Sequence, residues 1–171
     1  MRIALITDGI SPYVLGGMQK HSFYLAKYFA KNKIDVDLIH YNDSKYDINT
    51  LEFFTDEERK YIHSTVLPFP TSAKFPGHYL YKSYKYSCLA FDAIKDKLNT
   101  YDFIYTKGFT GWKLISEKHK GNITCCKIGV KFHGYEMFQI APEPKAKLQQ
   151  FLLRPIVRKI SQQADIVFSY G

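Results

Sequence analysis

Two stretches of this 171-residue sequence combine residue types that could contact a polar or anionic ligand. The first is the glycine pair Gly16-Gly17, at the end of a loop over residues 8–17. Glycines at a helix entrance leave backbone N–H groups unobstructed at the positive end of the helix dipole, which suits a phosphate or a sugar hydroxyl. The pair also fits a tight helix start that needs glycine for close packing, and spacing alone leaves both interpretations open.

The second stretch is Phe-His-Gly-Tyr-Glu at residues 132–136. Histidine has an ordinary pKa near neutrality, so His133 could donate to a phosphate or hydroxyl, or accept a proton. Gly134 allows a sharp turn, and Glu136 could orient the imidazole or bind a hydroxyl. A structural interpretation is equally open, in which His133 packs at a strand end and Glu136 caps the next segment.

The elements that would position these residues follow from apolar patterning, because strand-length apolar runs alternate with segments of helical period. We predict strands over residues 2–7, 35–41, 61–67, 102–106, 127–132 and 165–169. We predict helices over residues 17–31, 55–60, 77–98, 111–120 and 145–163. Thr55 with Glu58 fits a capping box, and Pro155 should interrupt or kink the last helix.

The repeated strand-then-helix order predicts an α/β fold, a Rossmann-like doubly wound parallel sheet with helices on both faces. In such sheets the ligand crevice lies at the carboxyl ends of the strands. Both chemical stretches follow predicted strands, so we expect them at that edge. We also expect a second domain to follow residue 171, since the chain ends directly after its last strand with no helix to close the unit.

Composition excludes several classes of protein. A hydrophobic fraction of 46% is enough for a folded core, and no apolar run reaches the length of a signal-peptide core or a membrane span. Three cysteines without CxxC or Cys/His metal spacing predict neither a disulfide framework nor a metal, and indicate a reducing, cytoplasmic location. The loop at residues 8–17 matches neither GxGxxG nor a Walker A motif, which argues against a bound NAD cofactor and against P-loop chemistry.

Together the segments resemble the family 4 glycosyltransferases of the GT-B fold. The family opens with a strand, a long loop ending in two glycines, and a helix with a histidine a few residues later, as Gly16-Gly17 and His21 stand here. Its HGxE segment corresponds to residues 133–136, and its closing Ala-Asp-apolar strand to residues 164–169. A departure occurs at residues 105–108, where many relatives carry a His-rich turn and this chain reads Tyr-Thr-Lys-Gly.

The resemblance implies that residues 1–171 are the N-terminal, acceptor-side domain of a two-domain enzyme whose donor-binding domain is absent from this chain. The implied reaction is transfer of a sugar, with retention, from a nucleotide-sugar to a hydroxyl of a glycan or lipid-linked acceptor, in bacterial surface-polysaccharide synthesis. The nucleotide-sugar would be a co-substrate, with no metal and no further cofactor. This domain alone is expected to be inactive.

The resemblance also implies roles for single residues. Gly16 and Gly17 would approach the donor diphosphate through backbone N–H groups, and His133 would be catalytic, stabilising the charge that develops on the leaving group. Glu136 would support donor contact. His21 matches a family position, although its place on the inner helix face also fits a structural role. At the departure from the family pattern, Lys107 could still serve an anionic acceptor.

The net charge of +8 leaves the partners open. Basic residues interleave with aromatic ones over residues 74–85 and cluster again over residues 145–159. A solvated lysine-rich face explains this, and so does peripheral contact with the inner membrane surface or an anionic acceptor. No nucleic-acid-binding module is legible, so no nucleic acid partner is expected. Two other functions remain open, a non-catalytic α/β domain that binds a phosphorylated or anionic ligand and a related GT-B nucleotide-sugar epimerase.

Overall fold

The computed structural model describes residues 1–42, 53–73 and 75–169. Within these residues one sheet contains the strands β1 (Arg2–Ile6), β2 (Asp35–Tyr41), β3 (Ile62–Leu67), β4 (Phe103–Lys107), β5 (Lys127–Lys131) and β6 (Ile166–Val167). Every neighbouring pair is parallel, and the order across the sheet is β3-β2-β1-β4-β5-β6. The strand order reverses between β1 and β4, which confirms the predicted Rossmann-like, doubly wound α/β class.

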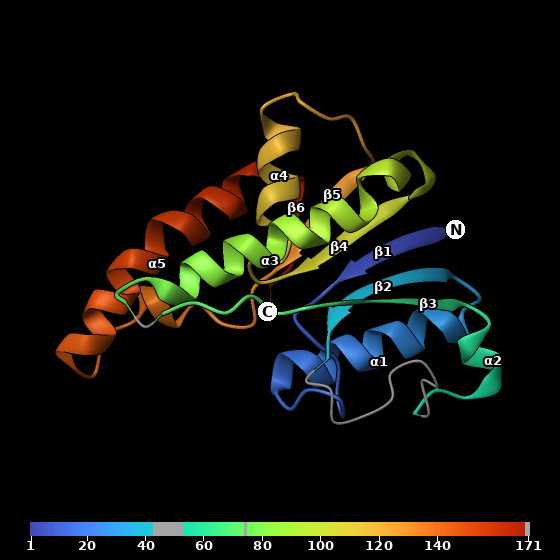
Figure 1. Cartoon of the computed structure of the whole chain (residues 1–171), viewed down its shortest axis with the longest axis horizontal. Helices are drawn as coiled ribbons and strands as arrows, with labels where there is room; N and C mark the ends of the chain where they lie inside the picture. The colour runs from blue at the N-terminus through green and yellow to red at the C-terminus, as the bar shows by residue number, and fades with distance from the viewer. Residues whose placement is uncertain (43–52, 74, 170–171) are drawn as a thin grey trace.

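Helices cover both faces of the sheet (Figure 1). Two helices lie on one side, α1 (Gly17–Lys31) and the short α2 (Asp56–Arg59). The other side carries α3 (His78–Ile94), α4 (Trp112–His119) and α5 (Pro144–Gln163). Two 3-10 turns complete the described chain, η1 (Lys95–Thr100) and η2 (Glu136–Phe138).

The sheet separates two hydrophobic cores. On the α1 face, Leu5 and Leu38 pack against Ala26 and Ala30 of the helix. On the opposite face, a larger core joins Ile6 and Ile104 with side chains of α3, α4 and α5. Burying an aliphatic side chain of this size stabilises the fold by about 1.5–3 kcal/mol. Because both faces are covered, β1 reads as a continuous apolar run, which is why the sequence identified it.

Three predictions made from local sequence signals can be compared with the structure, which confirms one and corrects two. The capping box is confirmed, since the Thr55 hydroxyl accepts from the Glu58 amide at 3.3 Å and the Glu58 carboxylate accepts from the Thr55 amide at 3.0 Å. The predicted helix over residues 77–98 is wrong at its end, because α3 stops at Ile94 and the chain tightens into η1. The interruption predicted near Pro155 is also wrong, since α5 runs through this residue as one helix, and a kink there stays a prediction.

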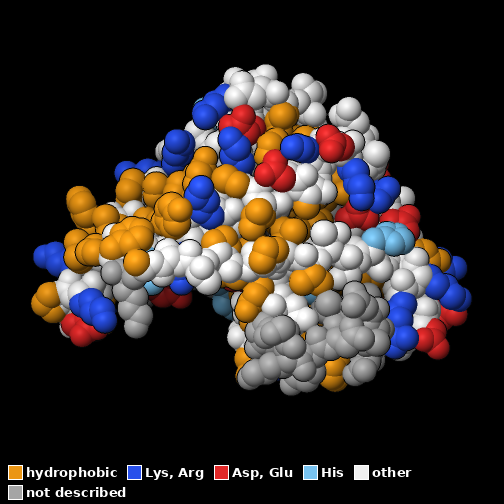
Figure 2. All heavy atoms as spheres, viewed as in Figure 1, with side chains coloured by type: hydrophobic (Ala, Val, Ile, Leu, Met, Phe, Trp, Pro, Cys, Tyr) orange, Lys and Arg blue, Asp and Glu red, His pale blue; other side chains and the backbone are white. Residues whose placement is uncertain are grey.

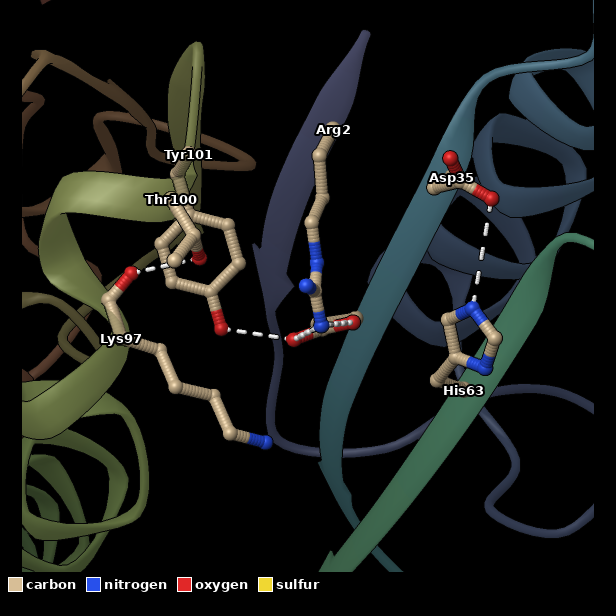
Figure 3. A network of polar contacts seen from close by, with 7 residues as sticks. Arg2, Asp35, His63, Lys97, Thr100 and Tyr101 are labelled. Carbon is tan, nitrogen blue, oxygen red and sulfur yellow. Dashed lines mark hydrogen bonds and ion pairs between the residues drawn. The ribbon is translucent and has the colours of Figure 1, made fainter.

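The amino ends of the strands are held together by a buried carboxylate (Figure 3). Arg2 of β1 donates two hydrogen bonds to Asp37 of β2, at 2.9 and 3.0 Å, and the Tyr101 hydroxyl donates a third at 2.7 Å. Asp37 is 6% exposed. Hydrogen bonding to Asp37 raises the pKa of the Arg2 guanidinium, while burial first and Asp37 second raise the pKa of the Tyr101 phenol. Opposite charges therefore meet here and satisfy one another.

Candidate functional site

A cavity of about 200 Å³ opens at the carboxyl ends of β1, β4 and β5, beside the reversal of strand order. Asp8, Lys107 and His133 line it from the ends of these strands, and Tyr79 of α3 and Glu136 of η2 contribute to the wall. Ligands of open α/β sheets bind at this kind of position. The structure therefore places Lys107, His133 and Glu136, which the sequence singled out, around one cavity.

The glycine pair stands directly beside the histidine. Gly16 precedes α1 with φ of 154°, a backbone conformation that residues with a Cβ rarely adopt. Gly17 is the first residue of α1, and a Cβ placed on it would lie 3.0 Å from Nε2 of His133. Both glycines and His133 are exposed. The first helix and the end of β5 thus approach closely, so that a side chain at position 17 would press against the His133 imidazole.

The turn after β5 brings Glu136 back over the chain. The Glu136 carboxylate lies against Gly134 so closely that a Cβ at position 134 would collide with it. The Glu136 carbonyl accepts a hydrogen bond from Gln150 of α5 at 2.9 Å, which ties η2 to that helix. Gly134 therefore leaves space for the Glu136 carboxylate, and Glu136 places an acid on the cavity wall that His133 also lines.

Lys107 and His21, predicted separately, form a direct contact. Lys107 Nζ donates to Nδ1 of His21 at 2.6 Å, and the lysine is only 1% exposed. Burial, and secondly the charge of Lys131, lower the pKa of Lys107 to about 7, while Asp8 acts in the opposite direction. Burial first, then Lys107, Lys131 and His133, lower the pKa of His21 to about 4. His21 is therefore a neutral acceptor at neutral pH, beside a lysine that changes charge near pH 7.

The sequence interpretation missed Lys131 and Asp8. Lys131 is the last residue of β5, is 8% exposed, and pairs in register with Lys107 on the neighbouring strand. Asp8 follows β1, accepts a hydrogen bond from Gln19 at 3.0 Å, and has a pKa raised mainly by burial. Lys131 ends β5 as Lys107 ends β4, but the strand order and register that make the two residues neighbours cannot be read from sequence periodicity.

The site combines exposed backbone, an imidazole and a group of buried bases. Backbone N–H groups at the start of α1 can bind an anion, and His133 lies next to them. Behind this rim, Lys107, Lys131 and His21 gather on the α1 face of the sheet. The arrangement suits binding of phosphate or hydroxyl groups and stabilisation of negative charge.

Several other features of the described residues bear on chemistry. The three cysteines, Cys88, Cys125 and Cys126, are free thiols. Across residues 1–42, 53–73 and 75–169 no three His, Cys, Asp or Glu side chains gather as a metal site would need. In the same part of the chain no helix has the length and apolar character required to cross a membrane. Lys74, in the aromatic and basic stretch, lies outside the described residues.

Comparison with solved structures gives a likeness that is weak where it is described in detail. No protein-family model matches the sequence, and no curated protein matches it. Among solved structures, a chain of an alpha-glucosyltransferase, in complex with UDP and a 13-mer DNA containing a central A:G mismatch, is 16% identical with a TM-score of 0.47. The alignment covers 99% of this chain and 37% of that chain. A likeness of this degree carries no argument about function, and the fold class rests on the strand order itself.

Proposed function

We propose that this chain is the acceptor-side Rossmann-like domain of a retaining GT-B glycosyltransferase that acts together with a donor-binding domain. The sugar would move from a nucleotide-sugar to an acceptor hydroxyl. The bond between the anomeric carbon and the diphosphate breaks and its electron pair leaves with the diphosphate. The acceptor oxygen forms the new bond on the same face of the sugar, and its proton is transferred to the departing diphosphate.

The close approach of Gly17 to His133 supports this proposal. These residues are 116 positions apart in sequence, and they meet at the reversal of strand order with Nε2 of His133 only 3.0 Å from a Cβ placed on Gly17. The absence of a side chain at Gly17 leaves space beside the imidazole for a ligand to contact both groups. The resemblance to family 4 glycosyltransferases assigns donor contact to the same two motifs.

In this proposal the backbone N–H groups of Gly16 and Gly17 face the donor diphosphate. His133 donates to the transferred sugar or its phosphate and stabilises the charge that develops on the leaving group. Glu136, held over Gly134, supports the donor sugar. Lys107 and His21 lie on the acceptor side.

A glycan or lipid-linked acceptor fits the surface beside this site. Phe138, Ile140, Leu148 and Phe151 are exposed by 43–97% along η2, the segment after it and α5, and Lys145 and Lys147 lie among them. Figure 2 shows apolar side chains gathered over α5 and the beginning of α3, with basic side chains around them. Apolar and basic groups together favour the surface of an anionic membrane. The proposed location is therefore cytoplasmic, at the inner face of the membrane, in bacterial surface-polysaccharide synthesis.

A second candidate function is a non-catalytic domain that binds a phosphorylated or anionic ligand. The buried lysines at the ends of β4 and β5 favour it, since they would serve binding without any transfer step. A nucleotide-sugar epimerase of the GT-B type is a further alternative, because it would use the same donor without an acceptor.

A donor screen tests the proposal. UDP-, GDP- and ADP-sugars are titrated calorimetrically against the protein with its donor-binding domain and against residues 1–171 alone, and sugar transfer is followed by mass spectrometry of added acceptors. We expect binding and transfer by the two-domain protein and neither by this domain alone. Donor binding followed only by epimerisation of the sugar contradicts the transferase, as does the absence of binding in both forms.

A further inference from the structure

A groove runs between the beginning of α3 and the first half of α5. It has a volume of about 570 Å³, within the range of about 300–1,000 Å³ that is typical of ligand sites. Its walls are mainly aliphatic and aromatic side chains, Phe75, Pro76, Leu80, Leu148, Leu152 and Leu153. A Cβ placed on Gly77, just before α3, would lie 3.9 Å from Cδ1 of Leu152, so the two walls of this apolar groove approach each other closely.

One face of α5 forms a wall of the apolar groove. Its residues follow the i, i+3, i+4, i+7, i+8 spacing of a single helix face, Lys145, Leu148, Gln149, Leu152 and Leu153. At one edge of this face Leu153 packs against the core that contains Val157 and Ile160, whereas Leu148 at the other edge is 53% exposed. Exposed apolar side chains that gather in a groove mark a site for a ligand or a partner.

The charge around the apolar groove is basic. Residues 144–163, which form α5, contain no acid, and their bases are Lys145, Lys147, Arg154, Arg158 and Lys159. Among the described residues that line the groove, Lys145 is charged and none is acidic. Figure 2 shows basic side chains around the apolar ones over α5 and the beginning of α3. This complementarity of charge favours an anionic occupant.

The apolar groove offers few hydrogen-bonding side chains to an occupant. Besides Lys145, these are His78, Tyr79 and Gln149. A peptide laid in the groove would bury backbone N–H and C=O groups, and each such group that lacks a partner is unfavourable. A hydrocarbon chain has no such groups, so its burial against leucine and phenylalanine side chains is favourable along its whole length. The lining therefore favours a lipid over a peptide.

Tyr79 connects the apolar groove to the cavity at the carboxyl ends of the strands. This residue lines both, and its ring packs edge-on against Phe109 with 5.9 Å between the ring centroids. Phe109 follows β4 and also lines the cavity, as do Lys107 and Glu136. The two spaces thus adjoin, and an amphipathic molecule can place its chain in the groove and its polar end in the cavity.

We infer that the apolar groove binds the hydrocarbon chain of an anionic lipid. Leu148 and Leu152 contact the chain, and the bases of α5 attract the anionic group. That this lipid is the acceptor, with its hydroxyl in the cavity beyond Tyr79, rests on the proposed function. The acceptor is then a lipid rather than a soluble glycan.

The experiment is a calorimetric titration of the chain with butyl, hexyl and octyl phosphate, below the concentrations at which they form micelles. Each added methylene should tighten binding about fourfold, because the chain is buried against apolar side chains. We therefore expect octyl phosphate to bind at least tenfold more tightly than butyl phosphate. Octyltrimethylammonium, with the same chain and the opposite charge, should bind at least tenfold more weakly than octyl phosphate.

Two variants of α5 distinguish the apolar groove from the rest of the helix surface. Leu148 lines the groove, whereas Phe151, which is 70% exposed, does not. Because both side chains are exposed, Leu148→Gln and Phe151→Gln should leave the fold intact, which circular dichroism checks. Leu148→Gln should weaken the binding of octyl phosphate at least fivefold, and Phe151→Gln should leave it within twofold.

A second readout locates the ligand independently of affinity. In histidine-labelled protein, octyl phosphate should shift the imidazole resonances of His78, which lines the apolar groove, and leave those of His63 on β3 unchanged. Equal binding of butyl and octyl phosphate would overturn the inference, as would equal binding of octyltrimethylammonium or equal effects of Leu148→Gln and Phe151→Gln.

Other occupants of the apolar groove give different results. A dimer that dissociates in Leu148→Gln, seen by analytical ultracentrifugation, together with no binding of octyl phosphate, would assign the groove to a second copy of the chain and overturn the inference. The donor screen is a separate measurement. Binding of octyl phosphate without sugar transfer keeps the lipid groove and removes the proposed function, whereas sugar transfer without binding of octyl phosphate does the reverse.

Discussion

The two ends of the same sheet differ in the groups that surround their buried ionisable side chains. At the amino ends, the Asp37 carboxylate receives a guanidinium and a phenol hydroxyl, so the acid and the base are matched. At the carboxyl ends, Lys107 and Lys131 are neighbours in register and His21 beside them is neutral. The first arrangement stabilises the fold, whereas burial of the Lys107 ammonium in the second costs stability.

Substitutions at the two ends of these strands should therefore change the stability of the protein in opposite directions. A satisfied buried pair is costly to break, whereas removal of one member of a buried like-charge pair relieves repulsion. A costly buried charge next to a cavity and a reversal of strand order is typical of a functional site, and it favours that role for the carboxyl end. The four predictions below test this contrast.

The largest effect is expected at the amino end, from Asp37→Ala. The substitution leaves the Arg2 guanidinium and the Tyr101 hydroxyl without their carboxylate, and should lower the free energy of unfolding by about 3–4 kcal/mol in urea denaturation. The control is Asp92→Ala, which breaks an exposed ion pair with Lys95 and should cost less than about 0.5 kcal/mol. Equal losses of stability in Asp37→Ala and Asp92→Ala would show that the buried carboxylate stabilises the fold no more than an exposed ion pair does.

The next effect is a loss of stability in acid caused by His40 of β2. This fully buried imidazole bonds Ser64 at 2.9 Å, and burial lowers its pKa to about 4 from an ordinary 6.5. Between pH 6.5 and 4 the unfolded chain binds the proton and the folded chain does not, so the free energy of unfolding falls by about 3 kcal/mol as pH falls through this window. In His40→Gln, the free energy of unfolding measured by denaturation should depend much less on pH in this window. An unchanged pH dependence would show that groups other than His40 cause it.

At the carboxyl end we expect Lys107→Met to stabilise the protein, by about 2 kcal/mol at pH 7. The folded-state pKa of Lys107 is about 7, below its ordinary 10.5, so the cost of burying this lysine is nearly full at pH 7 and disappears as pH rises towards 10.5. The gain measured by denaturation should therefore shrink with increasing pH. Lys95→Met is the control, with a change below about 0.5 kcal/mol. A clear loss of stability in Lys107→Met would show that the lysine is part of the structural framework.

Much of the fold could be predicted from local patterns. The strand β2 and the helix α1 have the predicted bounds, since each is defined by its own period and its own flanking residues. Gly17 could be singled out because it stands at a predicted helix entrance, and His133 with Gly134 because they follow a predicted strand. Both signals lie within a short stretch of sequence. Their placement near one cavity then followed from the parallel arrangement alone.

The polar contacts could not be predicted in the same way. Asp37 bonds Arg2 and Tyr101, at separations of 35 and 64 residues, and Lys107 bonds His21 across 86 residues. Such pairs depend on strand order and register, which composition and period do not determine. Lys131 was missed for the same reason, because its meaning comes from lying next to Lys107 in the sheet.

The most direct test compares two histidines at opposite ends of the sheet, His133 and His63, in the two-domain protein that the proposed function requires. His63 lies on β3 at the amino end, 4.0 Å from Asp35, and is exposed, so His63→Ala is a matched control. We predict that His133→Ala lowers sugar-transfer turnover at least tenfold, about 1.4 kcal/mol of barrier, while His63→Ala stays within twofold of wild type. Unchanged turnover in His133→Ala, or equal losses in the two variants, would contradict the account of the carboxyl end as the site of chemistry.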